Sequence, residues 1–103
     1  MDKFAPNFNG TLLMSANATS QNVALPLGGG IFMRVVNAGA NLAYIETSAD
    51  ANGIAMVPTA NAGGGFVVLA NVPTDIMLKA GDTRIAAISA GNSTLYFTRG
   101  NTF

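Results

Sequence analysis

The chain contains no histidine, cysteine or tryptophan. Without histidine it lacks the usual general base near neutral pH, the commonest metal ligand and any Ser-His-Asp arrangement. Without cysteine it can form no disulfide, thiolate metal site or thiolate nucleophile. Its five carboxylates are scattered, with neither paired-carboxylate nor calcium-loop spacing. The sequence therefore predicts a protein that is not an enzyme and binds no metal or cofactor.

Charge is also scarce. Charged residues are 10% of the 103 residues, against about 25% in ordinary globular proteins, and the net charge is zero. No basic run offers a surface for nucleic acid. Apolar stretches such as residues 66–72 are far shorter than the ~20 residues of a membrane-spanning helix, and the first ten residues lack the pattern of a secretory signal. We therefore expect neither nucleic acid nor a membrane as a partner.

Half of the residues are apolar, so a surface with this little charge is expected to carry large uncharged patches. Such patches usually mark contacts with other subunits or partners. The alternative is a compact monomer, rich in alanine and glycine, with an uncharged polar surface of asparagine, serine and threonine.

Short apolar runs separated by turn residues extend along the whole chain. The two glycine-rich loops, residues 28–30 and 63–65, precede strands and lack a following Gly-Lys-Ser/Thr, so they are not phosphate loops. Turns are predicted at residues 50–53 and 79–82. The pattern predicts an all-β fold, a jelly-roll-like sandwich or barrel of eight to nine short antiparallel strands. The predicted strands are residues 11–15, 22–25, 31–37, 42–47, 54–57, 66–69, 75–78, 84–90 and 94–98.

The first residues differ from the rest, because Phe4 and Phe8 flank Pro6 without strand-like alternation. We divide the chain into an extended N-terminal arm, residues 1–10, and a single β-domain, residues 11–103. Large aromatic side chains are costly to expose, so the arm is expected to anchor on a neighbouring subunit. The alternative is a disordered terminus.

The last two predicted strands flank Gly91-Asn92, which predicts a two-residue hairpin. In that register both faces are mostly apolar, which means that the pair is covered on both sides or lies in an interface. Arg84 would face Arg99, an unfavourable pair unless a carboxylate, solvent or a partner chain screens the charges. The candidate interface residues are Phe4, Phe8, Arg84, Tyr96 and Arg99.

Three stretches, GGGIFMRVVNAG, NLAYIET and GDTRIAAISAGNSTLYFTRG, resemble a pattern in small structural proteins of tailed bacteriophages. In that group a Gly-led R-V-V-N-A-G strand is followed by an A-[FY]-[IV] strand. The chain closes with A-A-I-x-A-G-x-[ST]-T-L-Y-F-T-x-G. These motifs are residues 34–39, 43–45 and 86–100 here. The resemblance spans residues 28–100 apart from 49–65, and it transfers no catalytic residue.

The resemblance implies a virion component with a jelly-roll-like fold, most simply a capsid decoration (cement) protein that binds and stabilises the assembled head. Its partners would be the shell of major capsid protein and further copies of itself, as a trimer or dimer. It would be made in the host cytoplasm and reside on the capsid surface. Two alternatives stay open: a head–tail adaptor or tail or fibre module, and a module that binds carbohydrate or a host surface through Tyr44 or Tyr96.

Overall fold

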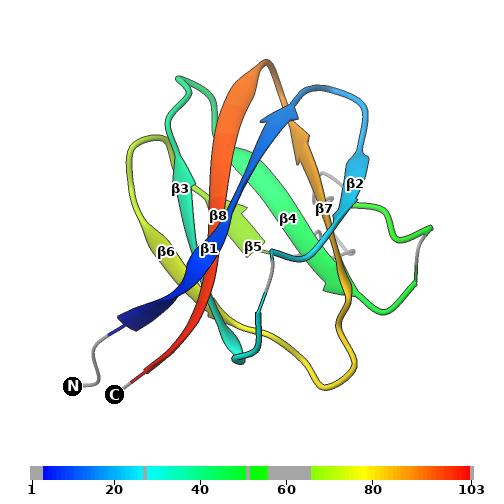
Figure 1. The fold of residues 1–103 in the computed structure, drawn as a ribbon. Coiled ribbons are helices and arrows are strands. Elements are labelled where there is room, and N and C mark those ends of the chain that lie inside the picture. The colour runs from blue at the N-terminus through cyan, green and yellow to red at the C-terminus, as the bar shows by residue number, and fades with distance from the viewer. Residues whose placement is uncertain (1–3, 27, 51, 56–65, 103) are drawn as a thin grey trace.

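All regular elements in the described part of the chain are β-strands (Figure 1). The computed structural model describes residues 4–26, 28–50, 52–55 and 66–102, and the side chains of residues 8, 9 and 102 lie outside that description. No helix that could cross a membrane occurs within these ranges. The strands are β1 (Phe4–Ala16), β2 (Gln21–Ala24), β3 (Phe32–Asn37), β4 (Ala43–Ser48), β5 (Phe66–Val68), β6 (Thr74–Met77), β7 (Arg84–Ser89) and β8 (Ser93–Thr102).

The eight strands form two four-stranded sheets, ordered β1-β8-β3-β6 and β2-β7-β4-β5. Every strand pair is antiparallel. Consecutive strands alternate between the two sheets except for β4 and β5. This order is that of a jelly roll, in which two Greek keys wrap into a sandwich. The predicted all-β, jelly-roll-like fold is confirmed.

The local predictions hold for most strands. Eight predicted segments correspond to β1–β8, with the largest end shifts in β1 and β8. Of the segment predicted at 54–57, Ile54 and Ala55 have irregular backbone, and the other two residues lie outside the described ranges. The predicted turns close with hydrogen bonds from Gly53 N to Asp50 O (3.0 Å) and from Asp82 N to Lys79 O (3.1 Å).

The space between the sheets is filled by one apolar core. Successive side chains of a strand point to opposite faces, so β3 and β4 each bury every second residue. In β4 the sequence itself alternates in this way, whereas β3 places apolar Phe32 and Val36 on its outer side and buries Asn37. The buried cluster comprises Met14, Ala16, Met33, Val35, Ala43, Ile45, Val68, Ile76, Leu78, Ile85, Ala87, Leu95 and Phe97.

The predicted hairpin between β7 and β8 is wrong. β7 pairs with β2 and β4, whereas β8 pairs with β1 and β3 in the other sheet. Residues 90–92 therefore cross between the sheets. A glycine-asparagine turn signal indicates that the chain reverses direction, and both a hairpin and a crossover satisfy that requirement.

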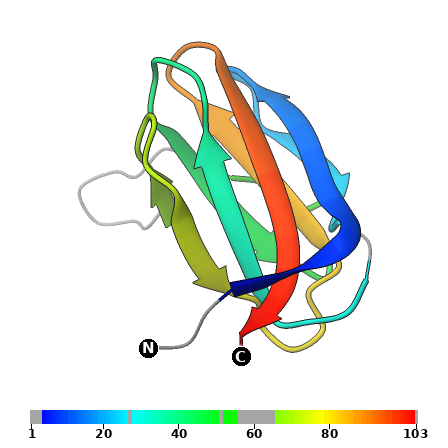
Figure 2. The same cartoon turned by 60° about the vertical axis from the view of Figure 1, so that its left-hand side comes forward.

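The predicted boundary between arm and domain falls inside β1, which already begins at Phe4. Phe4, Ala5 and Pro6 pair with Thr102, Asn101 and Gly100 of β8, and the register then shifts before Thr11 pairs with Thr98. Figure 2 shows the first part of β1 (dark blue) running across the lower end of β8 (red). These residues are thus part of the sheet rather than a separate arm.

Candidate interaction surface

The outer side of sheet β1-β8-β3-β6 forms a broad exposed surface, here called the front face. It consists of the side chains that alternate with the buried ones in these four strands. Their cross-strand partners place them in rows across the sheet. The front face comprises Phe4, Thr11, Leu13, Ser15, Phe32, Arg34, Val36, Asp75, Met77, Thr94, Tyr96 and Thr98.

One row of the front face is apolar. Leu13 of β1 pairs with Tyr96 of β8, which in turn pairs with Val36 of β3. Leu13 is 56% exposed and Tyr96 41% exposed, although both are large apolar side chains. A contiguous apolar row across three strands is a feature of interaction surfaces rather than of solvent-facing sheets.

The next row is polar and internally satisfied. The hydroxyl oxygens of Thr11 and Thr98 lie 2.9 Å apart in a hydrogen bond. Arg34 donates from Nε to Oδ1 of Asp75 (2.7 Å) and from Nη2 to Oδ2 (2.9 Å). The two side chains are equally exposed, at 43% each. The front face therefore carries one positive and one negative group, which form a hydrogen-bonded ion pair.

This pairing shifts both ionisation equilibria toward the charged forms. Hydrogen bonding from Arg34, reinforced by its charge, lowers the pKa of the Asp75 carboxyl, although partial burial opposes the shift. The hydrogen bond to Asp75 correspondingly raises the pKa of Arg34. Both groups are charged across the physiological pH range.

Phe4 contacts the same row through the side chain of Arg34. The guanidinium carbon of Arg34 lies 4.6 Å from the centroid of the Phe4 ring, within the range of a cation–π contact. Phe4 is consequently half-buried. This contact explains how a sequence segment without strand alternation is held on the sheet.

The candidate interface residues from the sequence do not come together as one site. Phe4 and Tyr96 lie on the front face, while the side chain of Phe8 lies outside the described residues. Arg84 and Arg99 do not face each other, because β7 and β8 belong to different sheets. Arg34 was not among the predicted residues, because its partner Asp75 is distant in the sequence and lies beside it only through the β3–β6 pairing.

Both of the other arginines find acceptors within the chain. Arg84 Nε donates to Oδ1 of Asn22 at 2.7 Å, and Arg99 Nε donates to the carbonyl of Gly30 at 3.0 Å. These acceptors are an amide and a backbone carbonyl rather than carboxylates. Their geometry gives both guanidiniums a structural role.

Apolar side chains are also exposed in the other sheet, on both sides of edge strand β5 and in the segment that follows it. We call Phe66, Val67, Leu69 and Val72 the β5 patch, because all four are between 44% and 51% exposed. No charged residue occurs between Asp50 and Asp75. This charge-free run is the signal of the patch in the sequence, although a run of apolar residues without charge does not by itself distinguish a surface from a buried strand.

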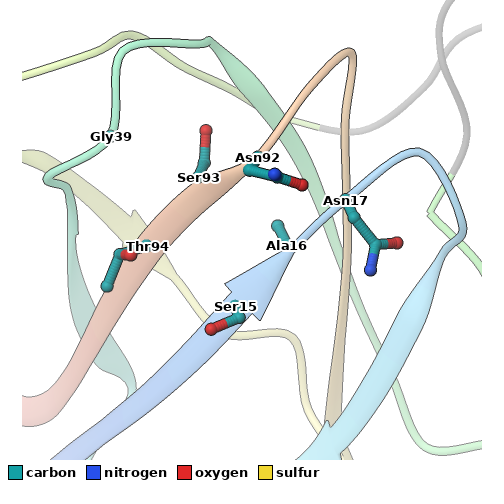
Figure 3. Close-up of a pocket in the computed structure, with 7 residues that line it drawn as sticks. All are labelled: Ser15, Ala16, Asn17, Gly39, Asn92, Ser93 and Thr94. Carbon is teal, nitrogen blue, oxygen red and sulfur yellow. The ribbon is translucent and has the colours of Figure 1, made fainter.

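Polar side chains gather at one end of the sandwich, where a depression of about 360 Å³ is lined by Ser15, Ala16, Asn17, Gly39, Asn92, Ser93 and Thr94 (Figure 3). Beside it, buried Asn37 donates from Nδ2 to the carbonyls of Asn41 (2.7 Å) and Val68 (3.3 Å). Ser93 Oγ also donates to the Asn41 carbonyl, at 2.7 Å. These groups satisfy one another and close the end of the core.

The chain has no significant match among models of protein families, curated proteins or solved structures. In the part of the chain that the structure describes, no three acidic side chains lie together as metal ligands. The front face and the β5 patch are the candidate functional surfaces because they expose large apolar side chains.

Proposed function

We propose that this protein is a structural component of a tailed-phage virion, specifically a decoration protein that binds the assembled capsid. The resemblance in sequence supports this role. Its motifs lie in β3, β4, β7 and β8, where they supply core residues such as Val35, Ile45 and Phe97. These motifs therefore describe the packing of the sandwich, and they contain no catalytic residue that the resemblance transfers.

The observation that carries the proposal is the presence of uncharged, apolar side chains on the outer sides of both sheets. Tyr96 and Leu13 expose apolar surface on one sheet, and Val67 does so on the other. A small domain with two such surfaces can contact two neighbours at once. A protein that reinforces a shell by linking subunits needs this capacity.

The mechanism is mass action. A protein that binds only the assembled shell lowers the free energy of that shell relative to its dissociated subunits. At a free concentration one hundred times Kd, the stabilisation is about 2.7 kcal/mol for each occupied site. Many such sites on one shell act together against disruption.

Sedimentation with capsids tests the proposal. Purified protein is mixed with capsids stripped of minor components or with free capsid subunits, and then centrifuged. We expect the protein to pellet with capsids but not to associate with free capsid subunits, and to raise the temperature at which the capsids are disrupted. Val67→Lys and Leu69→Lys are expected to weaken pelleting at least tenfold, because each places a charge in the β5 patch.

The matched control is Ala24→Lys, which adds the same charge at an exposed position of β2, the strand at the opposite edge of the sheet from β5. Failure to pellet with capsids, together with an unchanged disruption temperature, would refute the decoration role. A closed ring of six or twelve chains in solution would favour a head–tail adaptor instead.

Carbohydrate binding has weaker support. A sugar site normally needs exposed aromatic rings next to polar side chains, and the two tyrosines lie on different sheets, Tyr44 in β4 and Tyr96 in β8. The depression in Figure 3 is lined by no aromatic residue.

A further inference from the structure

We propose that the front face binds the front face of a second copy of this chain, with a twofold axis along the strands between β8 and β3. This inference goes beyond the proposed attachment to a shell, since it concerns the isolated protein. It is carried by the charge distribution, the order of side chains in the rows and the size of the face.

The charge distribution selects a neutral partner. The one cation of the front face, Arg34, is bound by Asp75 through two hydrogen bonds. A nucleic acid or an acidic protein would have to compete with that carboxylate. A second copy presents the same balanced pair and imposes no such competition.

The polar row is complementary to the same row of a second copy when that copy presents it in the opposite direction. Across β1, β8, β3 and β6 the row reads Thr11, Thr98, Arg34, Asp75. The twofold axis reverses this order in the partner, so Arg34 faces a Thr98 hydroxyl and Asp75 faces a Thr11 hydroxyl. A hydroxyl can accept from the guanidinium and donate to the carboxylate.

The apolar row behaves in the same way. Reversal places Tyr96 of one copy over Val36 of the other, twice in each dimer, while Leu13 covers the partner beyond Val36. Aligned sheets packed face to face stand about 10 Å apart and cross at about 30°, so the strands of each copy lie about 15° from the axis. The central pairs therefore meet, and the large Tyr96 ring has a smaller side chain opposite it.

The size of the face is adequate for a dimer. The four strands have 13, 10, 6 and 4 residues, and at about 3.3 Å by 4.8 Å per residue they give about 500 Å² in projection. Side-chain relief adds to this area. A standard interface buries about 800 Å² of accessible surface per partner, so the front face alone approaches the required area.

Sedimentation velocity over a concentration series from micromolar to hundreds of micromolar tests the proposal. We expect the wild-type chain to sediment at twice its single-chain mass at the upper end. Tyr96→Lys is expected to raise the dissociation constant at least a hundredfold. Leu13→Lys, at a more exposed site on an edge strand, is expected to raise it at least tenfold while leaving the fold intact.

Val67→Lys is the matched control, because Val67 is about as exposed as Tyr96 (45% against 41%) and lies on the other sheet. Circular dichroism shows that each variant is folded. A monomeric wild type at all concentrations, a trimer, or equal dissociation by Val67→Lys would each overturn the proposal. Because no capsid is used, failure of the dimer and failure of capsid binding are separate results.

Discussion

At the scale of single residues, Arg34 connects three strands of the front face. It lies on β3, binds Asp75 of β6 in a bidentate pair and contacts the ring of Phe4 from β1. Each contact is modest, because the ion pair is nearly half exposed to solvent. Together they fix the side chains on which the proposed dimer depends.

The lowered pKa of Asp75 makes a small part of the stability depend on pH. The folded-state pKa lies below the ordinary value of about 3.9. The pair therefore stabilises the protein above that value, and its contribution is lost as the pH falls through the lowered pKa. We expect Asp75→Asn to cost less than about 1 kcal/mol at pH 7, because the pair is exposed.

Urea unfolding of the wild type and of Asp75→Asn, at neutral pH and at a pH below the carboxyl transition, measures this contribution. The difference in the free energy of unfolding between the two proteins should be smaller at the acidic pH. A difference that grows on acidification would contradict the assignment of the pair.

At the scale of elements, the first part of β1 depends on the absence of a side chain at Gly100. Gly100 is buried in β8, and an added Cβ would collide with the carbonyl oxygen of Ala5 and lie 2.9 Å from Pro6 Cα. The backbone of β1 therefore crosses β8 at a distance that only glycine permits. Phe4 reaches Arg34 through this crossing.

Gly100→Ala is expected to push residues 4–6 off β8 while residues 11–16 of β1 stay paired. The expected loss of stability is about 1–3 kcal/mol, typical of overpacking a close contact. Hydrogen exchange should accelerate at those amides of residues 4–5 and 100–102 that bond β1 to β8, because alternate amides of a strand point toward each neighbouring strand. Gly29→Ala is the control, because nothing lies within 4 Å of a Cβ there. Unchanged exchange at these bridging amides would show that the crossing tolerates a side chain.

At the scale of the whole molecule, the two sheets are joined at one end by buried polar groups as well as by the core. Asn37 of β3 donates to the carbonyl of Val68 in the opposite sheet and accepts from Gly39 N (2.9 Å). Its side chain is fully buried. Removing one partner of such a set leaves buried polar groups without hydrogen bonds.

We expect Asn37→Ala to lower the free energy of unfolding by about 2–4 kcal/mol. The substitution opens a small cavity and leaves the Val68 carbonyl and the Gly39 amide without their hydrogen-bond partner. Ser15→Ala, at an exposed position on β1, should change it by less than about 0.5 kcal/mol. Thermal and urea unfolding measure both variants. Equal losses in the two would mean that the Asn37 contacts do not support the junction between the sheets.

Much of the fold was predictable because its signals are local. Alternation in residues 43–48 indicated which of their side chains are buried, and Gly81 with φ 85° occupies a turn where glycine is expected. The candidate site was predictable only in part. Tyr96 was identified for its aromatic side chain, but the hairpin register used to place it was wrong.

The sequence by itself determined that this is an all-β domain of short strands without histidine or cysteine chemistry, since composition, alternation and turn residues are properties of neighbouring positions. Tertiary structure alone decided that β7 and β8 separate into two sheets, that Arg84 and Arg99 find different acceptors, and that Arg34 meets both Asp75 and Phe4. The physical reason is that turn residues indicate where the chain reverses direction, but they do not indicate which sheet the next strand joins. Strand partners are selected by burial of apolar faces from distant parts of the chain.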